Sequence, residues 1–106
     1  DAMAEEDKTE ENRVKGCQAT VWLKSQTDDQ TPPCLSFVAD SNSQIVKGLV
    51  YILHLMFSGK SISEIIVYDE KAIFSRLGLD RHLSPTRSTG LNAMVQQIKA
   101  QARSAG

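Results

Sequence analysis

The 106-residue chain has little of what several common protein classes require. It contains only two cysteines and three prolines, and its formal net charge is −1 with a pI of about 6.1. Small secreted domains that depend on disulfides carry more cysteines, and nucleic-acid-binding domains carry a basic surface. The composition therefore argues against a disulfide scaffold and against a nucleic-acid partner.

Long apolar runs and processing signals are also missing. The most apolar stretch, residues 48–57, is too short to span a bilayer, and no secretory signal pattern is present. Hydrophobic residues make up 41% of the chain and charged residues 24%, which is ordinary for one globular domain. We expect a cytoplasmic protein without a membrane partner.

The familiar catalytic motifs are absent from the sequence. It has no Cys-x-x-Cys, His-Glu-x-x-His, Gly-x-Ser-x-Gly or phosphate-binding loop. Hydrolase, zinc and nucleotide chemistry therefore lack support. His54 and His82 stand alone and are more simply interpreted as satisfied or solvent-facing histidines.

Apolar residues alternate with polar ones in the first ordered part of the chain. This period of two predicts a half-buried strand over residues 17–24 and a second strand over residues 34–39, joined by a proline-containing loop over residues 25–33. In that hairpin Lys24 would face Cys34, and Cys17 would face Ser41.

Helical spacing replaces the alternation after residue 40. Residues 40–43 offer N-caps for a helix that ends at Gly59, and Ser61 with Glu64 fits a capping box. Further helices are predicted over residues 70–77, closed by Gly78, and over residues 89–103, with Leu91, Met94, Val95 and Ile98 facing inward. Strands followed by helices predict an α+β fold, a small antiparallel sheet with helices packed on one face.

The chain is expected to form one domain over residues 13–104, preceded by a polar lead-in over residues 1–12 that is flexible or loosely attached. Gly48 and Gly90 lie inside predicted helices, where glycine is unfavourable by about 1 kcal/mol relative to alanine. Close packing against another element would explain both.

Cys17 is the principal candidate for chemistry. Gly16 permits a sharp turn just before it, and the preceding cations Arg13 and Lys15 favour the reactive thiolate. The predicted register also places Cys17 beside the capped start of the first helix, whose amides stabilise anions. The alternative is an inert, buried cysteine in a plain interaction module. Cys34 would lie about 23 Å along the sheet, so we interpret it as structural packing.

Three segments resemble the SufE family of sulfur acceptors in iron–sulfur cluster assembly. They are residues 12–22 (NRVKGCQATVW), residues 39–41 with 45–49 (ADS and IVKGL), and residues 83–91 (LSPTRSTGL). The resemblance implies a fold shared with IscU scaffolds and a persulfide on Cys17. It implies no cofactor in this chain, and partners that are a pyridoxal-phosphate-dependent cysteine desulfurase (SufS-like or CsdA-like) and a SufB-like scaffold complex. Supporting or docking positions would be Gly16, Gln18, Asp40, Lys47 and Arg87.

Family members usually begin with additional helices upstream of the residue that is Asp1 here. The main alternative is an iron–sulfur scaffold like IscU. A scaffold needs several converging thiolates, and this chain has only two cysteines, which are predicted to lie far apart. A stand-alone enzyme is not expected, because no general base pairs clearly with Cys17. The resemblance therefore implies a sulfur carrier that also activates its desulfurase.

Overall fold

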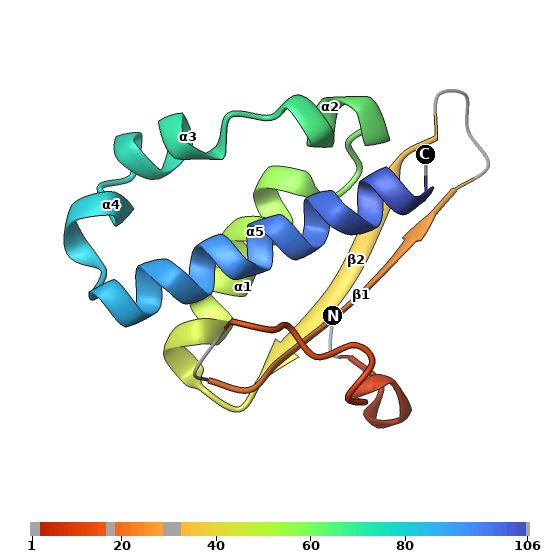
Figure 1. Ribbon diagram of the computed structural model, residues 1–106, viewed down its shortest axis with the longest axis horizontal. Helices are drawn as coiled ribbons and strands as arrows, with labels where there is room; N and C mark the ends of the chain where they lie inside the picture. The colour runs from red at the N-terminus through yellow and green to blue at the C-terminus, as the bar shows by residue number, and fades with distance from the viewer. Residues whose placement is uncertain (1–2, 17–18, 29–32, 106) are drawn as a thin grey trace.

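The computed structural model describes residues 3–16, 19–28 and 33–105, and they form the predicted α+β fold (Figure 1). In chain order the elements are a 3-10 turn η1 (Glu5–Asp7), β1 (Val21–Thr27), β2 (Leu35–Ser41), α1 (Gln44–Phe57), α2 (Ile62–Val67), α3 (Glu70–Arg76), α4 (Leu79–His82) and α5 (Pro85–Ala105). None of these helices combines the length and the apolar character needed to cross a membrane.

The two strands form the expected antiparallel hairpin, but the predicted register is wrong. Val21, not Cys17, pairs with Ser41, and Lys24 pairs with Val38. The reason is that β1 continues through Thr27, so the connection is shorter than the polar stretch suggested. Ladder hydrogen bonds use only the backbone, and polar side chains at the projecting end of a ribbon do not prevent them. The strand also begins at Val21, because Ala19 and Thr20 are not in β-structure, while Cys17 and Gln18 lie outside the described residues.

The helix ends follow the predicted capping signals. Ser43 caps α1 by accepting a hydrogen bond from the Val46 amide, and Ser61 with Glu64 forms the complete capping box of α2. The one large difference is α5, which begins at Pro85 rather than at residue 89. Proline suits the first turn of a helix, where its missing N–H group has no intrahelical partner. The short α4 was not predicted.

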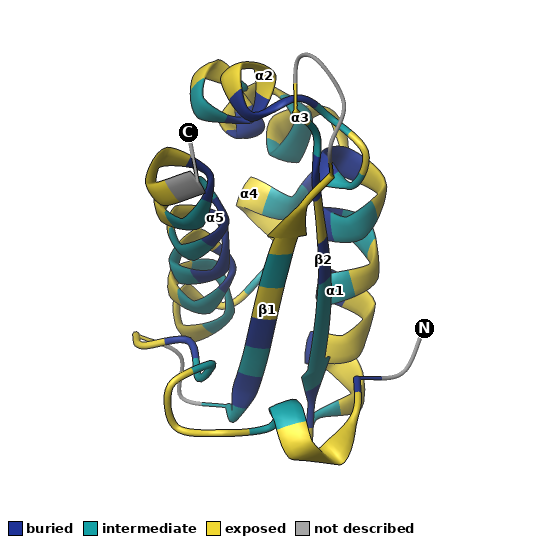
Figure 2. Ribbon diagram, turned by 90° about the vertical axis from the view of Figure 1, so that its right-hand side faces the viewer, coloured by how far each residue is buried: buried dark blue, intermediate teal, exposed yellow. Residues whose placement is uncertain are grey.

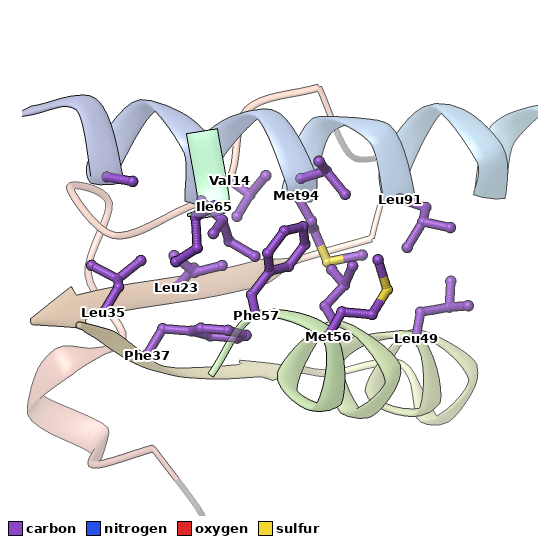
Figure 3. Packing of buried hydrophobic residues seen from close by; sticks show 14 of the residues in the cluster. Val14, Leu23, Leu35, Phe37, Leu49, Met56, Phe57, Ile65, Leu91 and Met94 are labelled. Carbon is purple, nitrogen blue, oxygen red and sulfur yellow. The ribbon is translucent and has the colours of Figure 1, made fainter. Parts of the chain in front are cut away.

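The core lies between α5, α1 and the inner face of the sheet (Figure 3). Figure 2 shows α5 alongside β1 and α1 alongside β2, in agreement with the contacts between these elements. Leu91, Met94, Val95 and Ile98 of α5 are buried, as predicted. The other buried side chains come from both strands, α1, α2, the second half of α5 and the segment before β1: Val14, Val21, Leu23, Leu35, Phe37, Val46, Leu49, Leu53, Met56, Phe57, Ile62, Ile65 and Ala102.

The described part of the lead-in, residues 3–12, contacts the sheet. The Lys24 ammonium lies 3.0 Å from Asp7, and the Lys8 ammonium lies 3.1 Å from Asp40 and 5.7 Å from the centre of the Trp22 ring. Met3 is buried as well. These contacts join the described part of the lead-in to the sheet; the flexibility of residues 1–12 and the domain boundary at residue 13 stay predictions.

Candidate functional site

The loop that contains Cys17 is closed at its base by backbone pairing. The Val14 amide donates to the Val21 carbonyl over 2.8 Å, and Arg13 forms an antiparallel bridge with Trp22. Val14 is buried in the core, so this base is anchored by packing as well as by hydrogen bonds. Residues 15–16 and 19–20, the described residues beyond this base, are therefore attached to two fixed points. Cys17 and Gln18 themselves lie outside the described residues.

The described residues on either side of that pair both lie against α5. Gly16 has a φ of 90°, the left-handed conformation that a sharp turn at glycine requires. A Cβ atom built on Gly16 would lie 3.3 Å from the Cβ atom of Ala93. Ala19 lines a cavity together with Gly90 and Met94 of the same helix. One face of α5 thus supports both flanks of the cysteine.

That cavity, of about 280 Å³, lies between the start of β1, the start of α1 and the first half of α5. Its apolar lining comes from both helices and the strand: Ala19, Val21, Val46, Leu49, Leu91 and Met94. Ser43, Thr86 and Arg87 supply the polar lining. The cavity therefore joins an apolar interior to a polar rim at the ends of two helices.

The rim is electropositive. Ser43 is the N-cap of α1, and Arg87 lies in the first turn of α5, so the positive ends of both helix dipoles face the same region. The Arg87 amide donates to Ser84 Oγ over 3.2 Å. Its guanidinium is half-buried and has no carboxylate within ion-pair distance among the described residues. A rim of this kind suits an anion such as a thiolate or persulfide.

Asp40 and Lys47 are brought together, but beside a different cavity. Their charged atoms lie 3.8 Å apart, and both side chains line a hollow of about 250 Å³ between β2 and α1 with Tyr51 and His54. The Ser41 amide donates to Asp40 over 2.8 Å. That hydrogen bond, followed by the ammonium of Lys8, holds the pKa of the Asp40 carboxyl below its ordinary value. Asp40 is therefore a fixed anion at the end of β2.

Cys34 is half-buried at the opposite end of β2, in a bridge with Ser61. It lies seven positions before Ser41, which corresponds to about 23 Å of extended strand. Ser41 is in turn adjacent to the Cys17 loop, because its hydroxyl donates to the Thr20 carbonyl over 2.7 Å. No group of three His, Cys, Asp or Glu side chains in the described ranges could hold a metal ion.

Two features of this site were not predicted. Lys8, the partner of Asp40, belongs to a lead-in whose charged composition gave no sign of a specific contact. Ala93 was also missed, although a small residue three positions after Gly90 places two small side chains on one face of a helix. The prediction that Gly48 packs closely against another element is wrong, because nothing lies within 4 Å of a Cβ atom built there.

The architecture is that of a small α+β domain in which Gly16 and Ala19, the described residues on either side of Cys17 and Gln18, lie beside α5. Residues 1–102 match the family described as "SufE: Fe-S metabolism associated domain". Two similar proteins are an uncharacterised SufE-like protein of Rhizobium etli, 46% identical over 102 residues, and one of Rhizobium meliloti, 45% identical over 101 residues. The first alignment covers 95% of this chain and 69% of the relative, and the second covers 94% and 72%. The chain belongs to the SufE family.

Proposed function

We propose that this protein is a sulfur acceptor, which takes persulfide sulfur from a cysteine desulfurase onto Cys17 and delivers it for iron–sulfur cluster assembly. The observation that carries the proposal is the family match over residues 1–102, since it includes the cysteine and the segments around it. The protein would act in the cytoplasm as a carrier and activator, not as a stand-alone enzyme.

The chemical step is a relative of thiol–disulfide exchange. The Cys17 thiolate attacks the terminal sulfur of the desulfurase persulfide. A new S–S bond forms to Cys17, the S–S bond in the desulfurase breaks, and its electron pair leaves on the desulfurase cysteine as a thiolate. The terminal sulfur keeps its proton, so no external oxidant or reductant is needed. Removing the persulfide frees the desulfurase for another turnover.

The electropositive rim around Arg87 supports this chemistry. An anionic sulfur beside Arg87 and two helix N-termini would be stabilised, because opposite charge lowers the cost of the charged form. We assign Arg87 this anion-stabilising or docking role. Asp40 would anchor the neighbouring backbone through its hydrogen bond from Ser41. Gly16, Gln18 and Lys47 are supporting or docking positions in the same proposal.

The partners proposed are a pyridoxal-phosphate-dependent desulfurase of the SufS or CsdA type and a SufB-like scaffold complex. The pyridoxal phosphate belongs to the desulfurase, and the carrier needs no cofactor for a thiol exchange. The two exposed lysines among the supporting segments are each paired with a carboxylate, Lys15 with Glu10 at 3.1 Å and Lys47 with Asp40 at 3.8 Å, so Arg87 is the cation that this proposal relies on.

The test is desulfurase turnover measured with increasing amounts of the wild type, Cys17→Ser and Cys34→Ser. The proposal expects stimulation by the wild type and by Cys34→Ser, and none by Cys17→Ser. Arg87→Ala should weaken stimulation, whereas Arg103→Ala, an exposed arginine in the last turn of the same helix, should not. Equal stimulation by Cys17→Ser and the wild type would overturn the proposal. Absence of stimulation with several desulfurases of both types would leave the inert interaction module as the better account.

A further inference from the structure

The backbone at Gly16, just before Cys17, lies close to α5. Gly16 has no side chain, and its φ of 90° is a conformation that other residues rarely adopt. Even a single methyl group at this position would meet Ala93 at 3.3 Å, slightly inside ordinary carbon–carbon contact. The backbone at Gly16 therefore rests directly on the side chain of Ala93.

The helix face under the loop carries small residues where the described part of the loop contacts it. Gly90 and Ala93 are three positions apart and so lie on one face of α5. Ala19 lines the cavity with Gly90, and Gly16 lies on Ala93. Larger residues of the same helix, Leu91 and Met94, point into the core. The size of the side chain at position 93 thus determines how closely the loop approaches.

The loop has little freedom to adjust to a larger neighbour. Its base is fixed by the hydrogen bond from Val14 to Val21, and the buried Val14 side chain holds that base in the core. On the other side, Thr20 accepts a hydrogen bond from the Ser41 hydroxyl. An added side chain at position 93 would consequently displace residues near position 16 rather than move the whole segment.

We propose that Ala93 is a positioning residue for sulfur transfer: its small side chain seats the Gly16 backbone on α5 and so sets the place of the cysteine that follows. The inference rests on the proposed function of Cys17. Ala93 does not contact the reacting sulfur in this account and acts only through Gly16. Enlarging it should misplace the thiol while leaving the domain folded.

The test compares Ala93→Leu with Ala100→Leu. The two alanines lie two turns apart, on the same face of α5, and both changes add the same volume with a good helix former. Ala100 is exposed, at a surface hollow with Ser25 and Ser104, away from the Gly16 contact. We expect Ala93→Leu to lower the maximal desulfurase stimulation about tenfold or more, because small misplacements of reacting groups carry costs of that order. The carrier concentration that gives half-maximal stimulation should change much less, and Ala100→Leu should behave like the wild type.

A second measurement reports on the thiol without a partner. The rate of alkylation by iodoacetamide, resolved by peptide mass spectrometry, should change at Cys17 and stay constant at Cys34 in Ala93→Leu. Ala93→Ser, which barely changes the side-chain volume, should restore both readouts. Gly16→Ala adds a methyl group on the loop side of the same contact and also strains the positive φ of this position, so it should change both readouts even if Ala93→Leu does not fold.

The outcomes separate this inference from the proposed function. If the wild type fails to accept sulfur, the proposed function fails. If the wild type accepts sulfur and both Ala93→Leu and Gly16→Ala match it, the positioning role is wrong. Equal losses in Ala93→Leu and Ala100→Leu would also overturn it, since they would indicate a general effect on α5. A change in half-maximal concentration alone would reassign Ala93 to partner docking.

Discussion

A buried ion pair joins the start of α3 to the middle of α5 and allows a quantitative prediction. Lys99 Nζ lies 2.7 Å from Glu70 Oε1 and donates to the Tyr68 carbonyl over 2.7 Å. The side chains of Lys99 and Glu70 are only 12% and 9% exposed. The pair thus ties the segment between α2 and α3 to the helix that carries Arg87 and supports the Cys17 loop.

Lys99→Met removes the ammonium group and keeps most of the apolar stem. It leaves the Glu70 carboxylate buried without a counter-charge, which typically costs 3–5 kcal/mol; some solvent access lowers our expectation to about 2–4 kcal/mol. The double variant Lys99→Met with Glu70→Leu removes both charges, and its stability should return to within about 1 kcal/mol of the wild type. For a domain of this size, a loss of 2–4 kcal/mol corresponds to a Tm lower by about 10–20 °C.

The assay is urea unfolding followed by circular dichroism and by the fluorescence of Trp22, for the wild type, both single variants and the double variant. If Lys99→Met loses less than about 0.5 kcal/mol, the pair behaves like an exposed one and the reasoning is wrong. If the double variant is no more stable than Lys99→Met, the loss comes from the packing of the lysine stem instead of from the unpaired charge.

Two further predictions concern the surface near the site. Gly48→Ala should raise the free energy of unfolding by about 1 kcal/mol, because the helix gains propensity and nothing lies within 4 Å of the new methyl group; a lower Tm would contradict this. Asp40→Asn should cost about 1 kcal/mol or less at pH 7, since the carboxylate is partly exposed. The lowered pKa of the Asp40 carboxyl means that its contribution is complete above the ordinary value near pH 4 and is lost as the pH falls through the folded-state pKa. The difference in stability from the wild type should therefore close in acid, and a gap that persists unchanged at pH 2 would refute the role of the charge.

The helices could be predicted well from the sequence because their signals are local. Ser43 and Ser61 cap helices where the sequence placed caps, and Gly59 and Gly78 adopt the positive φ values expected after helix ends. The predicted start of α5 was wrong by four residues. A Ser-Pro pair can end a loop or begin a helix, and the local sequence does not distinguish the two.

The hairpin register could not be predicted, because it depends on how far the strands continue into a polar segment. Residues 25–27 have no apolar alternation, yet the backbone ladder includes them and shifts every pair by four positions along β2. The physical reason is that strand pairing is set by backbone hydrogen bonds and the turn, while side-chain patterns record only which residues are buried.

For the candidate site, the sequence indicated which residues to consider but not how they lie relative to one another. Arg87, which the resemblance singled out, lies in the first turn of α5, and the structure adds the cavity that it lines. The contacts of Asp40 with Lys8 and of Gly16 with Ala93 join residues more than 30 positions apart in sequence, and composition and spacing do not reveal such pairs.

The most direct test of the account is to find where the sulfur goes. The wild type should be incubated with a cysteine desulfurase and cysteine, digested without reducing agent, and analysed by peptide mass spectrometry. The account predicts one added sulfur on the peptide that contains Cys17, none on the peptide that contains Cys34, and none on either peptide of Cys17→Ser. Sulfur on Cys34, or no sulfur on Cys17 while the desulfurase is active and stimulated, would contradict it.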